Sequence, residues 1–251
     1  MRSIRLLAFR AARRVLDPFV PARKKLPYSY WLLRLCGICG PELSHLNEFI
    51  VSTGTAIDVG ANEGLFTYAF SRRFQRVYAF EANEAVARPI AEYNPGNITL
   101  FTCGLSSASR VAKFFIPVTK GFASAGWGSL YRDNLPGAKE FIEMDVQLRP
   151  LDDFGITGVD FIKIDVEGHE AEVLKGAAQT IEQSRPVVLA EVRNEHLDNV
   201  SAWFRARNYK HYKLDELLQL RANTGDHLYA PAELSSRLSF SNRTNRVSSG
   251  L

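Results

Sequence analysis

The sequence predicts an α/β protein built on a doubly wound, mostly parallel sheet. Three apolar runs of strand length, residues 55–59, 77–80 and 159–164, each lead into an acidic or glycine-rich turn. In open parallel sheets the ligand binds in the crevice beyond the carboxyl ends of the strands, so these turns indicate a binding site. Glu81 follows Gly60 by 21 positions, the spacing of a ribose-binding carboxylate in nucleotide folds. Three such turns in order are a strong signal, although one alone would be weak.

The remaining elements follow from the spacing of the apolar residues. Strands are predicted over residues 55–59, 77–80, 98–102, 159–164, 187–192, 209–214 and 217–221. Helices are predicted over residues 65–74, 84–93, 169–183 and 200–205, with one or two more over residues 28–52. Residues 104–150 break this rhythm, because strand-like runs at 111–116 and 141–148 flank a loop that contains glycine and serine. We therefore expect a β-hairpin insertion over the active face.

The composition is that of one soluble globular domain, since 46% of the 251 residues are hydrophobic and 23% are charged. Three cysteines, Cys36, Cys39 and Cys103, do not make a disulfide framework and fit a reducing compartment, so we expect a cytoplasmic protein. The C-x-x-C spacing of Cys36 and Cys39 is also that of a zinc site. Such a site needs two further ligands at suitable spacing, so we expect these cysteines to pack under the first helix.

Positive charge is concentrated at the N-terminus. Residues 1–25 hold eight Lys and Arg side chains and one Asp, which leaves 23 basic and 26 acidic residues in the rest of the chain. A mildly acidic body disfavours nucleic-acid binding. The basic segment could contact an anionic membrane surface or pack loosely on the domain.

We divide the chain into a flexible or helical basic leader (1–27), one domain (28–230) and a tail (231–251) whose composition indicates disorder.

The turn after the first strand has the sequence pattern Asp58-x-Gly60-x-Asn62-x-Gly64, and it contains the acidic residue Glu63. A carboxylate would repel the pyrophosphate of a dinucleotide, whereas it is compatible with the ammonium and sulfonium groups of S-adenosylmethionine. The turn therefore favours S-adenosylmethionine over NAD or FAD. We expect the adjoining Glu81 to bind both ribose hydroxyls, and the turn after the third strand to flank the adenine. The predicted cofactor residues are Asp58, Gly60, Asn62, Gly64, Glu81, Cys103, Gly104 and Leu105.

The turn after the strand at 159–164 carries the groups that could act on a substrate. Moving a methyl group from a sulfonium to a hydroxyl needs in-line alignment and removal of the hydroxyl proton by a carboxylate or a histidine. A lysine inside a central strand is costly unless it is paired, so we expect it to contact the aspartate two positions later or a ligand group. A divalent cation would need more clustered ligands than this turn offers, so we predict no metal. The predicted catalytic residues are Lys163, Asp165, Glu167, His169 and Glu191.

These motifs resemble the FkbM-type methyltransferase family. The likeness covers about residues 53–195 and is carried by the turns at 58–64 and 80–83 and by the segments at 151–154, 159–168, 170–177 and 186–191. The resemblance implies a class I, Rossmann-like S-adenosylmethionine-dependent fold with seven strands, one of them antiparallel. It also implies O-methylation of a hydroxyl on a sugar, a glycan or glycolipid precursor, or a secondary metabolite. Residues 104–130 match the family pattern less well, so the acceptor stays open.

Two other classes of protein remain as alternatives. One is a nicotinamide-dependent oxidoreductase, against which the absence of a G-x-G-x-x-G turn argues. The other is a binding module that keeps the cofactor pocket without catalysis. Two aromatic residues of the insertion, Trp127 and Tyr131, either cover the acceptor or only pack in their loop. The sequence leaves the oligomeric state open.

Overall fold

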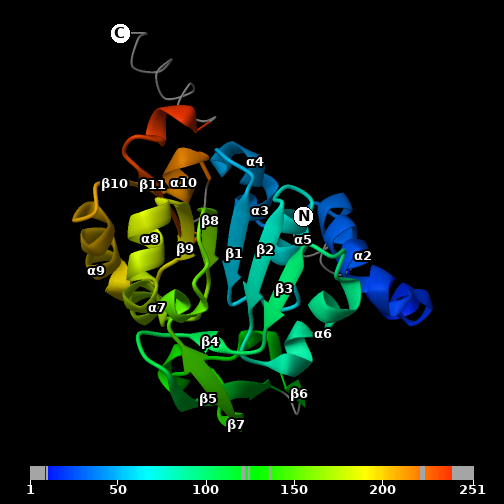
Figure 1. Ribbon diagram of the computed structural model, residues 1–251. Coiled ribbons are helices and arrows are strands. Elements are labelled where there is room, and N and C mark those ends of the chain that lie inside the picture. The colour runs from blue at the N-terminus through cyan, green and yellow to red at the C-terminus, as the bar shows by residue number, and fades with distance from the viewer. Residues whose placement is uncertain are drawn as a thin grey trace.

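The computed structural model describes residues 9, 11–119, 122–123, 125–135, 137–220 and 224–238. Within these residues, seven strands form a central sheet in the order β10-β11-β9-β8-β1-β2-β3 (Figure 1). β11 runs antiparallel to both of its neighbours, and the other pairs are parallel. This is the predicted fold class. The strands are β1 (Thr55–Val59), β2 (Arg76–Phe80), β3 (Ile98–Phe101), β8 (Val159–Ile164), β9 (Val187–Glu191), β10 (Tyr209–Lys213) and β11 (Asp226–Pro231).

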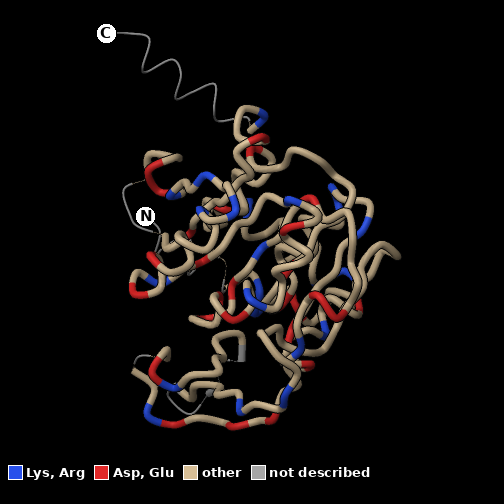
Figure 2. The backbone as a smooth tube through the Cα atoms, turned by 60° about the vertical axis from the view of Figure 1, so that its left-hand side comes forward, with Lys and Arg blue, Asp and Glu red and all other residues tan. Residues whose placement is uncertain are grey.

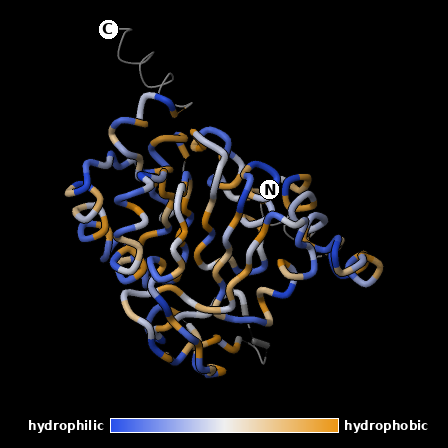
Figure 3. The backbone as a smooth tube through the Cα atoms, in the orientation of Figure 1, coloured by the Kyte–Doolittle hydropathy of each residue, from blue (hydrophilic) through white to orange (hydrophobic). Residues whose placement is uncertain are grey.

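Helices cover both faces of this sheet and enclose one hydrophobic core on each side. Figure 3 shows hydrophobic residues in the strands and an alternation of hydrophobic and hydrophilic residues along the helices. The first face packs against α2 (Ala22–Leu35), α3 (Pro41–Ser44), α4 (Leu46–Phe49), α5 (Leu65–Ser71), α6 (Glu84–Tyr93) and α10 (Leu214–Leu217). The second face packs against η4 (Leu151–Phe154), α7 (Glu170–Gly176), α8 (Ala178–Ser184) and α9 (Asn194–Arg205). Short 3-10 turns are η1 (Asp17–Phe19), η2 (Ala125–Trp127), η3 (Arg132–Asn134) and η5 (Ser235–Arg237).

Strand alternation places two charged residues side by side inside the first core. In β1, Ile57 packs on the second face, so Asp58 points to the first. In β8, Phe161 lies on the first face, and therefore so does Lys163. The register pairs Asp58 with Lys163 across the two strands, and both are buried, with 0% and 7% of their surface exposed. The centre of the sheet thus holds a carboxylate and an ammonium group together.

A second, smaller sheet in the order β4-β7-β5-β6 lies beyond the carboxyl ends of β1, β2 and β3 (Figure 1). It contains the predicted β-hairpin insertion, in which β5 pairs with β7 from Arg110↔Leu148 to Val118↔Glu140. Figure 2 shows basic and acidic positions mixed along it, and Lys113 and Asp145 form a salt bridge of 2.8 Å. Its strands are β4 (Gly104–Leu105), β5 (Arg110–Thr119), β6 (Phe122–Ala123) and β7 (Glu140–Arg149).

Two predicted elements are wrong. The helix expected over 169–183 is divided at Ala177 into α7 and α8, next to Gly176, which closely approaches another part of the backbone. A Cβ atom on Gly176 would lie 2.0 Å from the carbonyl oxygen of Ser106. The strand expected over 217–221 is absent from the described residues, and the last strand is β11 instead. Because helices cover both faces of the sheet, a strand between β9 and β10 is buried on both sides, and Leu228, Tyr229 and Ala230 are completely buried.

The packed domain extends beyond both predicted boundaries. Leu26 and Tyr30 of α2 lie in the first core, and α2 continues through Pro27. At the other end the chain is described as far as Leu238, which is 1% exposed in the same core. The rest of the predicted tail, residues 239–251, and residues 1–8 and 10 of the predicted leader lie outside the described residues. None of the helices in the described part of the chain is long and apolar enough to cross a membrane.

Candidate active site

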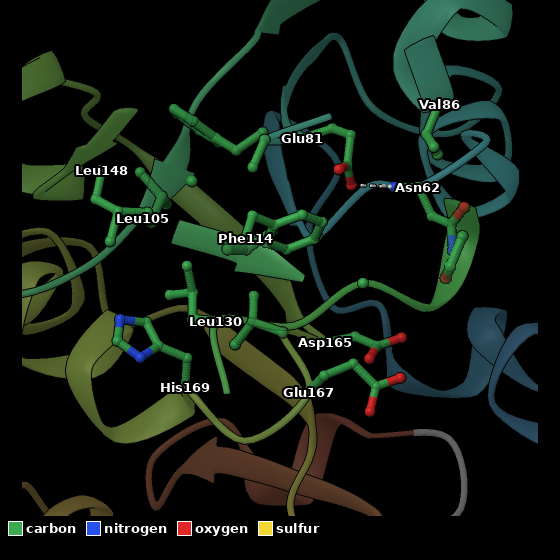
Figure 4. Close-up of a pocket in the computed structure, with 18 residues that line it drawn as sticks. Asn62, Glu81, Val86, Leu105, Phe114, Leu130, Leu148, Asp165, Glu167 and His169 are labelled. Carbon is green, nitrogen blue, oxygen red and sulfur yellow. Dashed lines mark hydrogen bonds between the residues drawn. The ribbon is translucent and has the colours of Figure 1, made fainter. Parts of the chain in front are cut away.

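A cavity opens where the carboxyl ends of β1, β2 and β8 face the small sheet (Figure 4). Five of the predicted cofactor residues line this first cavity. Three others stand outside its lining as far as the described residues define it. Cys103 is in the second core, Gly64 packs against Ile90 of α6, and Asp58 lines the neighbouring cavity. The five that line the first cavity are Gly60, Asn62, Glu81, Gly104 and Leu105.

Gly60 is required because two strand ends meet at this point. Its φ is +74°, and a Cβ atom would lie 1.9 Å from the carbonyl oxygen of Asp165. The backbone N–H of Asp165 donates to the carbonyl of Val59 at 3.0 Å, which ties the turn after β8 to the end of β1. Gly60 thus allows the turns after β1 and β8 to form one wall of the cavity.

The Glu81 carboxylate is held by two backbone N–H groups. Asn62 donates to Oε2, as Figure 4 shows, and Asn83 donates to Oε1, each at 2.9 Å. Burial raises the pKa of Glu81, whereas these two hydrogen bonds lower it. Each carboxylate oxygen has two acceptor positions, so each keeps one for a further donor. The arrangement suits a ligand that presents two neighbouring hydroxyl groups.

The opposite wall of the first cavity is apolar and comes largely from the insertion. Phe114, Leu130 and Leu148 line it together with Val86 of α6 and Leu105. The first four were not predicted. For Phe114 and Leu148 the side of the hairpin that faces the cavity depends on how the small sheet packs, and the alternation of apolar residues along 111–118 and 141–148 was the available signal. Val86 on α6 and Leu130 in the loop before β7 carry no such pattern.

Residues 125–135, which we call the covering segment, bridge the first cavity. Asn62 Nδ2 donates to the carbonyl of Gly126 at 2.9 Å on the side of β1. On the side of β8, Ser129 Oγ and Asn134 Nδ2 both donate to the carbonyl of Glu167, at 3.1 and 2.6 Å. The covering segment is therefore attached to both of the turns that Gly60 brings together.

His169 lines the first cavity, but both of its ring nitrogens are engaged. Nε2 lies 2.9 Å from Ser106 Oγ, and Nδ1 lies 3.0 Å from the Tyr131 hydroxyl. The side chain is buried, and burial lowers the pKa of His169 to about 4, so the ring is neutral at pH 7. In Figure 4 the carboxylates of Asp165 and Glu167 point away from this ring. The geometry suits a positioning role for His169, through Tyr131, better than that of a general base.

A second cavity adjoins the first, and Gly60, Asn62, Gly126 and Asp165 line both. Lys163 Nζ contacts Asp165 Oδ2 at 2.7 Å, which confirms the expected pairing. Although burial opposes the charged form, the carboxylates of Asp165 and Asp58 raise the pKa of Lys163. The two neighbours keep the lysine protonated.

Asp58 lines the second cavity, and only one of its two carboxylate oxygens accepts a hydrogen bond from a described residue. Oδ2 accepts a hydrogen bond of 2.6 Å from the hydroxyl of Thr67. Oδ1 is buried and has no hydrogen-bond partner among the described residues. An unpaired buried acceptor is costly, so this atom marks a place where a donor group of a ligand would be stabilised.

A third cavity carries the remaining predicted residue, Glu191, together with Asp226, Lys163 and Asp165. Burial and the charge of Glu42 raise the pKa of Asp226 to about 7. Asp165 lines all three cavities and is therefore their junction. The structure brings Lys163, Asp165 and Glu191 together in the third cavity and places Glu167 and His169 with Asp165 in the first.

The described residues hold no group of three or more His, Cys, Asp or Glu side chains arranged for a metal ion. Glu167 pairs instead with Arg193, 3.6 Å away. Cys36 and Cys39 are free thiols and are half-buried, and Cys39 packs against the first core.

The fold and the cavity define a Rossmann-like α/β protein with a pocket at the carboxyl ends of its strands. The chain belongs to the methyltransferase FkbM domain family, whose model matches residues 58–219. This confirms the resemblance found in the sequence.

Three solved structures illustrate what the chain is similar to. Methyltransferase FkbM from Methylobacillus flagellatus KT is 18% identical, with a TM-score of 0.49 over 87% of this chain and 60% of that one. Precorrin-6y C5,15-methyltransferase from Geobacter metallireducens GS-15 is 13% identical, with a TM-score of 0.42 over 68% of this chain and 71% of that one. A ribosomal protein L11 methylase from Lactobacillus delbrueckii subsp. bulgaricus is 12% identical, with a TM-score of 0.44 over 75% of each chain. No curated protein sequence matches the chain.

Proposed function

We propose that this chain is an S-adenosylmethionine-dependent O-methyltransferase that acts on a hydroxyl of a sugar, a glycan or glycolipid precursor, or a secondary metabolite. One observation carries the choice of cofactor. Among the described residues, the lining of the first cavity contains the carboxylates of Glu81, Asp165 and Glu167 and no Lys or Arg. Such a lining repels the pyrophosphate of a dinucleotide and favours a positively charged ligand that has no phosphate.

The residues fit S-adenosylmethionine group by group. Glu81 would bind the ribose hydroxyls, since each of its oxygens keeps an acceptor position. The apolar wall with Leu105 and Leu148 would hold the adenine. The unpaired Oδ1 of Asp58 would face the ammonium group. When bound, the cofactor supplies an electrophilic methyl group on its sulfonium.

Asp165 is the residue that we expect to receive the proton of the acceptor hydroxyl. It stands where the three cavities join, so it can reach both a ligand in the first and an acceptor in the second. Lys163 Nζ contacts Oδ2, which leaves Oδ1 to take the proton. The covering segment excludes water from above the first cavity. We expect Trp127, which lines the second cavity, to cover the acceptor.

Isothermal titration of the purified full chain tests the cofactor assignment. Saturable binding of S-adenosylmethionine and S-adenosylhomocysteine, without binding of NAD, is the expected result. Binding of NAD alone to the folded protein would replace this proposal by the oxidoreductase alternative.

Transfer of a radiolabelled methyl group to a panel of hydroxylated sugars and glycolipids then tests the reaction. An acceptor that is methylated by the native chain and far more slowly by Asp165→Asn would support it. Cofactor binding with no transfer to any acceptor would favour the non-catalytic binding module.

A further inference from the structure

The first described helices carry large apolar side chains on their outer surface. We call this the N-terminal surface, and it is formed by residues 11–20 and the outer side of α2. Monomeric soluble proteins rarely expose several large apolar residues in one region, and such a patch marks an interaction site. Its apolar members and their exposed fractions are Val15 (64%), Leu16 (46%), Phe19 (82%), Trp31 (59%) and Leu35 (85%).

The same surface is strongly basic. α2 contains no acidic residue, and residues 11–36 contain a single one, Asp17, which bonds to Arg13 at 2.9 Å. The chain outside residues 1–25 is acidic overall, so the positive charge is a local property of this region. The basic residues within 11–36 are Arg13, Arg14, Arg23, Lys24, Lys25 and Arg34.

The arrangement of α2 separates its two sides. Leu26 and Tyr30 face the first core, at 2% and 3% exposure. Trp31 and Leu35 follow one helical turn apart on the outer side, and Lys24 lies two turns before Trp31 on that side. The indole N–H of Trp31 donates to the Tyr68 hydroxyl at 3.1 Å, which fixes the ring while most of it stays exposed.

We propose that the N-terminal surface docks on an anionic lipid bilayer. Helices that lie in a membrane interface combine Lys and Arg with exposed Trp, Phe and Leu side chains, and both sets are present here. Nucleic acid would be bound by the charges alone and would leave Phe19 and Leu35, the two most exposed apolar residues, without a function. The apolar side chains enter the interface, and the basic ones bind the headgroups.

Docking would also orient the cavities. The chain that leaves α2 supplies Ile38, Cys39 and Gly40 to the walls of both the second and the third cavity. A bilayer under α2 would therefore lie close to the part of the molecule where we place the acceptor, as a lipid-linked acceptor requires. This consequence rests on the proposed function, whereas the docking itself does not.

Vesicle co-sedimentation of the full chain tests the docking without reference to activity. We expect tighter binding to vesicles of 70% phosphatidylcholine and 30% phosphatidylglycerol than to pure phosphatidylcholine. The double variant Lys24→Gln/Lys25→Gln should weaken binding roughly 30-fold, since each basic residue near a charged bilayer contributes about a factor of five. Phe19→Ser/Leu35→Ser should weaken it at least about tenfold. Binding of the native chain should be lost in 1 M salt, where the screening length is about 3 Å.

A matched control is available on the small sheet, where Val111 and Ile142 are 57% and 48% exposed. Val111→Ser/Ile142→Ser should bind vesicles like the native chain. Equal binding to neutral and anionic vesicles, no binding to either, or native-like binding by both N-terminal variants would overturn the proposal. So would a native dimer in light scattering that Phe19→Ser/Leu35→Ser converts to a monomer, because a second copy would then occupy the surface. Circular dichroism verifies that every variant is folded.

Discussion

Replacing Glu81 by Gln should weaken cofactor binding far more than its small change in shape implies. The native carboxylate accepts from Asn62 N–H on one oxygen and from Asn83 N–H on the other, each at 2.9 Å. In the Gln variant one of these N–H groups must face an NH₂ group in the free protein and in the complex alike, so this loss affects stability and the orientation of the side chain. Binding is weakened because the ionised acceptor for the two ribose hydroxyls is replaced by a neutral one. A loss of about 1.5 kcal/mol for each of these two charge-assisted hydrogen bonds, about 3 kcal/mol together, corresponds to a roughly 150-fold higher dissociation constant.

Isothermal titration with S-adenosylhomocysteine measures this change, at a temperature where circular dichroism shows both proteins folded. Glu84→Gln is the matched control, because it makes the same chemical change three positions later on an exposed side chain. It should leave the dissociation constant within about twofold, as expected of a surface substitution. A Glu81→Gln variant that binds as tightly as the Glu84→Gln control would refute the reasoning that places the ribose on Glu81.

Three further predictions concern Gly60, Asp165 and His227, a residue of β11. Gly60→Ala should lower the free energy of unfolding in urea by at least about 3 kcal/mol, against about 1 kcal/mol for Gly155→Ala. Both glycines have positive φ, but only at Gly60 would a Cβ meet backbone, that of Asp165, so equal losses would contradict this account. Asp165→Asn, which keeps an acceptor for Lys163, should lower kcat roughly 100-fold at saturating cofactor, and a change below threefold would exclude Asp165 as the base. Burial lowers the pKa of His227 to about 4. The unfolded chain therefore takes up the proton first, and stability falls as the pH drops from about 6.5 to 4. Over this pH interval the free energy of unfolding in urea should fall by about 3 kcal/mol more for the native chain than for His227→Gln. Equal losses for the two proteins would disprove the lowered pKa of His227.

The central sheet was predictable because parallel strands buried on both faces are continuous apolar runs. All five residues of β1 are buried, and its run was recognised at its observed bounds, Thr55–Val59. The C-terminal part was harder to predict. The apolar run near Leu217 has the length of a strand, whereas α10 is a short helix that begins at Leu214 and has Asp215 and Glu216 in its first turn. The choice between 217–221 and Asp226–Pro231 depends on which run fits between β9 and β10, and that is decided by tertiary packing.

The polar half of the candidate site follows from local sequence, and the apolar half does not. Gly60, Asn62 and Glu81 sit in turns directly after strands, so their meeting at one edge of the sheet is a consequence of the topology. Leu148 reaches the first cavity only because the small sheet is placed over that edge. His169 was interpreted as a candidate base from its position alone. Its two hydrogen bonds depend on Ser106 and Tyr131, which are 63 and 38 residues away in the chain.

A crystal structure of the full chain with S-adenosylhomocysteine tests the central claim most directly. The ligand should occupy the first cavity under the covering segment and extend into the adjoining second cavity, with its ribose hydroxyls on the Glu81 carboxylate and its ammonium group near Asp58. A ligand bound elsewhere, or one in this cavity with its ribose away from Glu81, would contradict the account.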